Sequence, residues 1–162
     1  MRFRRVGAAD EPLVVAAIHS SSRETLLHRF FSPIRSVTPE LLRQMLVLDP
    51  TRETCFVGVT ESENTARIVC GARYVKLLKP DAAEIALTVH DDFQRRGLGT
   101  FMMRLLARLA QVENLQWFEA EVLSTNDKML QLLRKLSGGQ ARGHWTGDVY
   151  HVEIPVQVLG AD

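Results

Sequence analysis

The chain is 162 residues long, with 46% hydrophobic and 24% charged residues and a formal net charge of +1. This length and composition are typical of a single folded domain, and they exclude a disordered or fibrous chain. Because basic and acidic residues nearly balance and no apolar run approaches the roughly 20 residues of a membrane span, we expect neither a nucleic-acid nor a membrane partner, but one soluble, cytoplasmic domain over residues 1–162.

The first fifty residues predict one strand followed by helices. Residues 2–6 have the pattern of a short strand, and a helix is expected to begin after Asp10, because an Asp cap with a proline close behind it is typical of a helix start. That helix either extends or restarts through Ser22–Phe31. A threonine followed by proline and glutamate then predicts another helix over Thr38–Leu48.

The rest of the chain alternates between strand-like and helical periods. Enrichment in β-branched and aromatic residues between turns predicts strands at 54–60, 67–77, 84–89 and 117–123. Apolar residues at helical spacing predict helices at 98–112 and 127–136. The tail, 143–158, is predicted to form one or two strands. Because the middle strands form hairpins, the fold class is a mixed α/β (α+β) fold and not a purely parallel sheet.

The junction between the strand at 84–89 and the helix at 98–112 carries the strongest functional signal. It reads Gln94-Arg95-Arg96-Gly97-Leu98-Gly99-Thr100. A helix N-terminus has unpaired N–H groups and a partial positive charge, and glycines let an anion approach the backbone. The loop therefore suits a diphosphate. A dinucleotide-binding loop fits poorly, because Met102 stands where that pattern has its third glycine.

This junction resembles the acetyl-CoA-binding signature of the GNAT superfamily of N-acetyltransferases, which reads Gln-x-x-Gly-x-Gly after a strand. Glu121–Met129 resembles the second motif of that family, a strand followed by an Asn-started helix. Arg29–Pro33 (RFFSP), Asp49–Val57 and Gly71–Tyr74 are similar to one subgroup, the bacterial protein lysine acetyltransferases. The resemblance spans roughly residues 2–157, and it implies the GNAT fold: a mostly antiparallel central sheet of six to seven strands, helices on both faces, and central strands that splay apart.

The resemblance also implies acetyl-CoA as the donor. In the family, the loop amides hold the diphosphate, the pantetheine arm lies between the splayed strands, and a strand amide, here that of Val89, polarises the thioester carbonyl. Asn126 would bond the arm, although it also has the pattern of a helix N-cap. The residues expected to contact acetyl-CoA are Leu87, Thr88, Val89, Gln94, Arg95, Arg96, Gly97, Leu98, Gly99, Thr100, Asn126 and Met129.

Transfer to an amine favours a nearby general base, because a lysine with a pKa of about 10.4 is mostly protonated at neutral pH. Glu84 is the first candidate, since strand alternation places it on a face of small side chains, and the resembling enzymes have a glutamate here as their proposed base. Glu119 and Glu121 are rivals on another strand. Many relatives use a tyrosine as general acid; Leu133 stands there, so no acid is assigned.

These observations predict direct acetyl transfer from acetyl-CoA to a primary amine, with a protein lysine, for example on an acyl-CoA synthetase, as the leading acceptor. A small-molecule amine is the alternative, and a non-catalytic CoA-binding regulatory module is the second alternative. The RFFSP segment and the helix after it are expected to form the acceptor side. Neither a covalent intermediate at Cys55 or Cys70 nor a metal site is predicted from the residue spacings. The chain is expected to be a monomer or a dimer.

Overall fold

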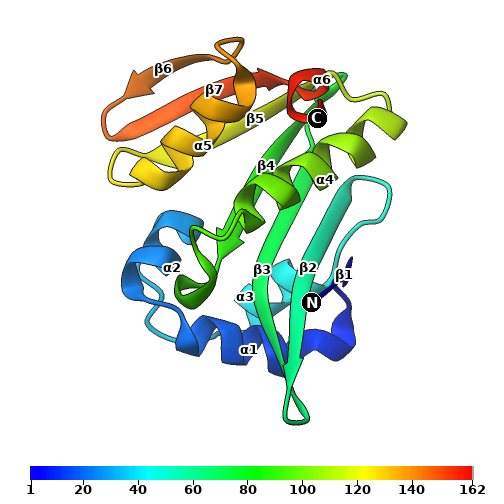
Figure 1. Cartoon of the computed structure of the whole chain (residues 1–162), viewed down its shortest axis with the longest axis vertical. Coiled ribbons are helices and arrows are strands. Elements are labelled where there is room, and N and C mark those ends of the chain that lie inside the picture. The colour runs from blue at the N-terminus through cyan, green and yellow to red at the C-terminus, as the bar shows by residue number, and fades with distance from the viewer. Residues whose placement is uncertain (162) are drawn as a thin grey trace.

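A seven-stranded sheet runs through the molecule in the order β1-β2-β3-β4-β5-β7-β6 (Figure 1). The computed structural model describes residues 1–161. The strands are β1 (Arg2–Arg5), β2 (Glu53–Ser62), β3 (Thr65–Lys76), β4 (Ala82–Val89), β5 (Trp117–Leu123), β6 (Arg142–Thr146) and β7 (Val149–Pro155). Every neighbouring pair is antiparallel except β4 with β5. The predicted mixed, mostly antiparallel sheet is confirmed.

Helices cover both faces of the sheet (Figure 1). They are α1 (Glu11–Ser20), α2 (Arg23–Phe30), α3 (Pro39–Leu46), α4 (Leu98–Val112), α5 (Asp127–Ser137) and α6 (Val156–Leu159), with short 3-10 helices at Ala8–Asp10 and Asp91–Phe93. The main core lies between the sheet and α4 to α6, and a smaller core lies beneath α1 and α3. None of the described helices is both long and apolar enough to cross a membrane.

Strand alternation decides which side chains enter the main core. On β3, Ala72 and Tyr74 are fully buried toward α4, while Arg73 between them points to the opposite face. Phe118 of β5 and Leu106 of α4 are also completely buried. Phe118 and Leu106 each contribute about 1.5–3 kcal/mol through burial, so this core fixes α4 against the sheet.

β4 and β5 pair over only three residues of each strand. The register is Ala82 with Trp117, Ala83 with Phe118 and Glu84 with Glu119. β4 continues to Val89 along β3, and β5 continues along β7, but the two strands no longer bond to each other. They diverge visibly from their shared end in Figure 1. The predicted splay of the central strands is therefore confirmed.

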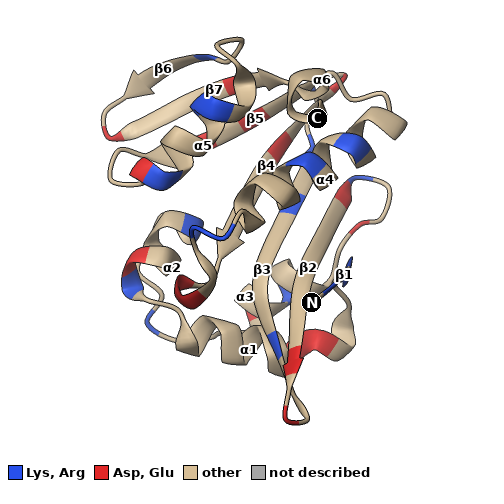
Figure 2. Ribbon diagram, viewed as in Figure 1, with Lys and Arg blue, Asp and Glu red and all other residues tan. Residues whose placement is uncertain are grey.

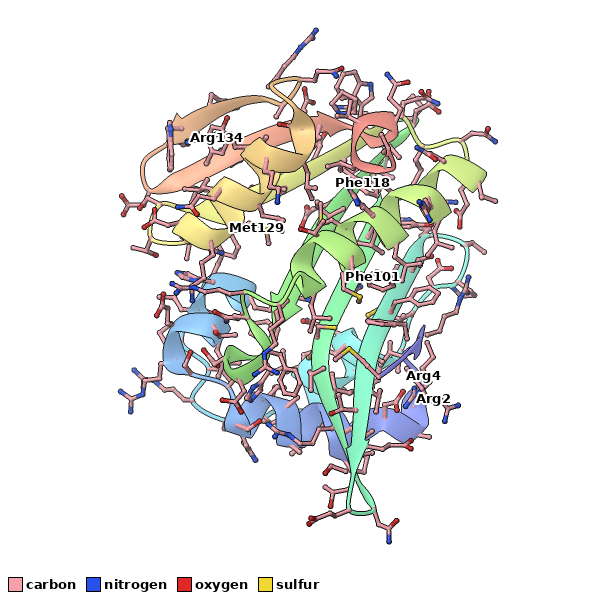
Figure 3. All side chains as sticks on the ribbon, in the orientation of Figure 1. Arg2, Arg4, Phe101, Phe118, Met129 and Arg134 are labelled. Carbon is pink, nitrogen blue, oxygen red and sulfur yellow. The ribbon has the colours of Figure 1, made fainter. Side chains whose placement is uncertain are left out.

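α1 begins after Asp10 as predicted, but the Asp10 side chain does not cap the helix. Asp10 does stand at the N-cap, but its side chain makes no hydrogen bond to the helix. It accepts two hydrogen bonds from the guanidinium of Arg4, at 2.6 and 2.7 Å, and one from the N–H of Gly7 at 2.9 Å. Figure 3 shows Arg4 at this edge of the sheet. The carboxylate thus ties α1 to β1, since an arginine fork offers it stronger bonds than the helix end does.

The observed ends of several elements also differ from the predicted ones. The N-terminal helix restarts at α2, with Ser22 as its N-cap accepting from the N–H of Thr25. The third helix ends at Leu46 instead of Leu48. The predicted strand through 158 was wrong in its last residues, because β7 ends at Pro155 and α6 follows. Val156 and Leu159 of α6 are buried against the core, and that burial outweighs their strand propensity.

Candidate functional site

Six consecutive backbone N–H groups at the start of α4 have no acceptor within residues 1–161. Three belong to the loop residues Arg95, Arg96 and Gly97. The other three belong to the first turn of α4, Leu98–Thr100, where no carbonyl is available within the helix. The first bond of the helix is donated by Phe101 to the carbonyl of Gly97, at 3.0 Å. Such a row of free amides is suited to binding an anion.

Left-handed backbone turns these amides to one side. Arg95 has φ 61° and Gly97 has φ 81°. A Cβ added to Gly97 would meet no atom within 4 Å, so this glycine serves the backbone conformation and leaves open space. At Gly99 a Cβ would approach Leu132 to 3.2 Å, so that glycine lets α4 pack closely on α5. The two glycines of the motif therefore have different tasks.

Positive side chains surround the free amides. Arg95 and Arg96 are exposed on the loop, and the guanidinium of Arg96 lies 5.1 Å from the centre of the Phe93 ring. Figure 2 shows the blue stretch of this loop where the chain enters α4. Lys128, in the first turn of α5, donates to the side-chain carbonyl of Gln94. Amides and cations together fit a diphosphate, the group that acetyl-CoA would place here.

Gln94 joins the loop to three neighbouring elements. Its amide nitrogen donates to the carbonyl of Val89 at 3.0 Å and to the hydroxyl of Thr25 in α2 at 3.3 Å. Its carbonyl accepts from Lys128 of α5. Gln94 therefore holds the loop between β4, α2 and α5, a task that the sequence motif alone did not reveal.

Backbone groups of β4 line the gap that opens toward β5. The N–H of His90 bonds to the carbonyl of Val69 in β3 at 2.8 Å. Because backbone groups alternate sides along a strand, those of Leu87 and Val89 point away from β3 and toward the gap. Thr88 presents its backbone to β3 and its side chain to the opposite face of the sheet. Two of the three predicted strand residues thus direct their main-chain groups away from β3, along the part of β4 that does not pair with β5.

Asn126 caps α5. Its side-chain oxygen accepts a hydrogen bond from the N–H of Met129 at 3.2 Å. Its NH₂ group donates no hydrogen bond within residues 1–161 and stays available to a ligand. Met129 is half-buried where α5 approaches α4, as its position in Figure 3 shows. The cap is therefore present, and it leaves room for the second expected role.

Glu84 differs from its two rivals in having no partner. It is exposed, and it makes no hydrogen bond or ion pair within residues 1–161. Glu119 is opposite it in register, but Lys79 binds that carboxylate and also reaches Glu153 at 2.8 Å. Glu121 lies 3.2 Å from a ring nitrogen of His151. Of the three candidate carboxylates, Glu84 alone has no hydrogen-bond or ion-pair partner among the described residues.

A cavity of about 100 Å³ lies on this face of the sheet, beneath α1 and α2. We call it the α1–α2 cavity; its walls include Ile18, Arg29, Phe30, Arg73, Ala86 and Thr88. Ala86 and Thr88 share their face of β4 with Glu84. Of the RFFSP segment, the first two residues line the cavity. Arg73 falls within the Gly71–Tyr74 segment of the subgroup resemblance, but its place in this cavity depends on how β3 pairs with β2 and β4.

Asp91 fixes α2 over the end of β4. It accepts hydrogen bonds from the N–H of Ser22 at 2.9 Å, the hydroxyl of Ser22 at 2.7 Å and the hydroxyl of Thr25 at 2.9 Å. Burial opposes ionisation of this carboxyl, but the hydrogen bonds from Ser22 and Thr25 outweigh it and hold the pKa of Asp91 below its ordinary value. No local sequence pattern predicts this role for Asp91, because its partners lie far away in the chain.

Sequence comparison places the chain among acetyltransferases. The model of the family described as "Acetyltransferase (GNAT) family" matches residues 21–138. Over 135 residues the chain is 33% identical to acetyltransferase Pat of Mycolicibacterium smegmatis, covering 83% of this chain and 40% of that protein. Over 94 residues it is 31% identical to acetyltransferase PA5475 of Pseudomonas aeruginosa, covering 58% of this chain and 50% of that protein. The chain thus spans half or less of these relatives.

Solved structures with the same fold include the GNAT domain of S. lividans PAT. That domain has a TM-score of 0.81 and 21% identity, covering 95% of this chain and 89% of that one. A cAMP-binding acyltransferase from Mycobacterium smegmatis has a TM-score of 0.61 and 27% identity, covering 95% of this chain and 43% of that one. The first likeness bears on the fold alone, and the second covers less than half of a longer protein.

Proposed function

The chain belongs to the GNAT acetyltransferase family, and from this premise we propose that it transfers an acetyl group from acetyl-CoA to the side-chain amine of a protein lysine. The observation that carries the donor half of the proposal is the row of six free amides beside the parted strands β4 and β5. The acceptor half is supported by the relative named Pat and by the sequence resemblance to bacterial protein lysine acetyltransferases.

We propose residues of this chain for two parts of the donor, the diphosphate and the pantetheine arm. The amides of Arg95 to Thr100 would bind the diphosphate, with the two arginines adjacent. The backbone N–H and carbonyl of Leu87 and the N–H of Val89 would bond the pantetheine arm, as a neighbouring strand does, while the Val89 carbonyl is already bonded to Gln94. The free NH₂ of Asn126 would reach the same arm from α5. Acetyl-CoA supplies an activated acyl group, and the protein supplies its position.

Glu84 is proposed as the general base. It removes a proton from the lysine ammonium, directly or through water, so that a neutral amine is present beside the gap. The amine nitrogen then bonds to the acetyl carbon as the carbon–sulfur bond breaks, CoA leaves as a thiolate, and the excess proton on the nitrogen passes to water or to the thiolate. The N–H of Val89 lies on the gap side of β4, where it would stabilise charge on the carbonyl oxygen. The thiolate needs no acid, since thiol pKa values are near 8.5.

An acceptor screen tests this proposal. The protein is incubated with acetyl-CoA and either acyl-CoA synthetases or a panel of polyamines, amino acids and aminoglycosides, and thiol release is followed together with the acetylated product by mass spectrometry. We expect acetyl-lysine on a protein acceptor, with release of one CoA per transfer. Acetylation of free amines alone would assign the small-molecule reaction instead, and binding of acetyl-CoA without release of CoA by any acceptor would assign a regulatory module.

A further inference from the structure

The α1–α2 cavity carries two guanidinium groups and no carboxylate. Among the described residues that line it, Arg29 and Arg73 are the charged ones and none is acidic. The rest of the wall is mostly apolar, with side chains such as Ile18, Val57 and Ala86. A small apolar cavity with cationic donors is complementary to an anion on a short hydrocarbon body. It is not complementary to an ammonium group.

Arg29 has no acceptor for its donors. It is half-buried in the last turn of α2, and within residues 1–161 its guanidinium makes no hydrogen bond or ion pair. Its contact is with the ring of Phe30, 5.0 Å from the ring centre. Burial lowers the pKa of Arg29 and Arg73 lowers it further, while Cys55 and Glu84 oppose this only in part. A half-buried guanidinium whose N–H donors meet no acceptor among the described residues favours a bound anion.

Two more donors in the same cavity are unused. The ends of Arg73 are occupied, because one nitrogen donates to Glu53 at 2.7 Å and another to the carbonyl of Gln44 at 2.8 Å. Its third nitrogen, Nε, is buried and has no partner. The hydroxyl of Thr88 is also buried without a partner. Buried polar groups in native proteins are nearly always bonded, so these groups together indicate a ligand.

We propose that the α1–α2 cavity is a carboxylate-binding subsite that recognises an acidic group on the amine acceptor. Arg29 is its main contact, and Arg73 Nε and the Thr88 hydroxyl are secondary donors. This deepens the proposed function and rests on it for the amine itself. Ala86, which lines the cavity, is two residues along β4 from Glu84, so an acceptor that spans both points has its amine at Glu84 and its carboxylate at Arg29.

Competition between matched acceptors tests the proposal. One pair is two blocked peptides that differ only in Glu or Gln beside a single lysine; the other is Nα-acetyl-lysine and its amide. We expect the wild-type protein to acetylate the acidic member of at least one pair about tenfold more efficiently in kcat/KM, the effect of one charge-assisted hydrogen bond. A preference in the first pair assigns the carboxylate to a residue beside the target lysine, and one in the second pair alone assigns it to a free amino acid.

Variants connect the preference to the cavity. In Arg29→Gln, the ratio of kcat/KM for the acidic acceptor to kcat/KM for its neutral partner is expected to fall to about one. Thr88→Val is expected to lower this ratio a few-fold without lowering the stability of the fold, because the lost hydroxyl has no partner. Arg23→Gln is the matched control: Arg23 is exposed on the same helix and does not line the cavity, so the preference is retained. Equal rates within both pairs, or a preference that survives Arg29→Gln in a folded protein, would overturn the proposal.

A binding measurement separates the subsite from the reaction. Butyrate and butyramide have the same size but differ in charge, and each is titrated into ¹⁵N-labelled protein while the Nε–H signals of the arginines are followed. We expect saturable shifts at Arg29 and Arg73 with butyrate, none with butyramide, and loss of the butyrate effect in Arg29→Gln. If butyrate binds in this way but no lysine is acetylated, the subsite stands and the protein-lysine assignment fails. If butyrate leaves these signals unmoved, the subsite fails.

Discussion

The loop at 94–100 and the α1–α2 cavity are built from different parts of the polypeptide. The loop uses contiguous backbone N–H groups, whose positions follow from one strand-to-helix junction. The cavity uses side chains from α1, α2, β2, β3 and β4, which meet only when the sheet and its helices have formed. Backbone amides can bind the same diphosphate whatever the surrounding side chains are. The shape and charge of the cavity, in contrast, depend on the side chains that line it, so they change when those residues are substituted. The loop, the proposed donor side, is therefore suited to a ligand that many proteins share, and the cavity, the proposed acceptor side, is suited to a ligand particular to this chain.

The largest expected effect is on the rate of acetyl transfer, and it should occur without any change in acetyl-CoA binding by the loop. Glu84→Gln should lower kcat/KM by about 10²–10⁴-fold, because the amine loses its base, while the Kd for acetyl-CoA stays unchanged, since Glu84 lies away from the loop. Thiol release measures the rate, and calorimetry measures the Kd. Glu121→Gln, which removes a carboxylate already beside His151, is the matched control with near wild-type rates. Full activity of Glu84→Gln would remove this residue from the mechanism.

A middle-sized effect concerns the support of the acceptor side. The hydrogen bonds from Arg4 lower the pKa of Asp10, burial opposes this, and the Gly7 N–H lowers it further. A lowered pKa means that the ionised carboxylate stabilises the fold at pH values above the unfolded pKa of about 3.9, and that this stabilisation is lost as the pH falls through the folded pKa. Asp10→Asn should therefore lower the free energy of unfolding by about 2 kcal/mol at pH 7.

Denaturant unfolding of the two proteins between pH 7 and pH 3 measures this difference. We expect it to shrink as the pH falls below about 3.9, because the unfolded wild-type chain then binds a proton at Asp10 that the folded protein, with its lowered pKa, does not yet bind. Arg43→Gln, which breaks an exposed ion pair with Glu40 on α3, is the control and should change stability little at any pH. A stability gap for Asp10→Asn that is constant across this range would show that the charge of Asp10 is not what holds α1 to β1.

The smallest effect concerns the donor side. Gly97→Ala and Gly147→Ala both place a Cβ on left-handed backbone, at φ 81° and 57°, and neither new Cβ meets an atom within 4 Å. Each should lower the free energy of unfolding by about 1 kcal/mol. Only the first should weaken acetyl-CoA binding, by about fivefold, because only Gly97 belongs to the row of free amides. Equal acetyl-CoA affinities in the two variants would separate the loop from donor binding.

The same contrast explains what the sequence could predict. The strand before the loop, the helix after it and the motif between them are local patterns, and each was placed within a few residues of its true position. The face of β4 that carries Glu84 followed from strand alternation. Predictions from local patterns were wrong where contacts with distant residues determine the structure. The side chain of Asp10 bonds to Arg4 and not to its own helix, and the last residues of the tail form α6 against the core instead of a strand.

The unoccupied donors of Arg29, Arg73 and Thr88 are features that depend on distant partners and not on local sequence patterns. Arg73 meets the cavity because it pairs with Cys55 on one side and Ala86 on the other, a register that no short window of sequence contains. Arg29 reaches the same place because Asp91 fixes the start of α2 against the end of β4. Strand register and helix docking are set by packing of the whole sheet, so the acceptor side could be expected only as a region and not as a set of residues.

Calorimetric titration with acetyl-CoA and with acetyl-pantetheine tests the central claim most directly. The two donors share the thioester and the pantetheine arm, but only acetyl-CoA has the diphosphate that the amides of residues 95–100 are proposed to bind. We predict one site for acetyl-CoA, with an affinity about 100-fold higher than that of acetyl-pantetheine, or about 2.7 kcal/mol. Equal affinities for the two donors, or no binding of acetyl-CoA, would contradict the account.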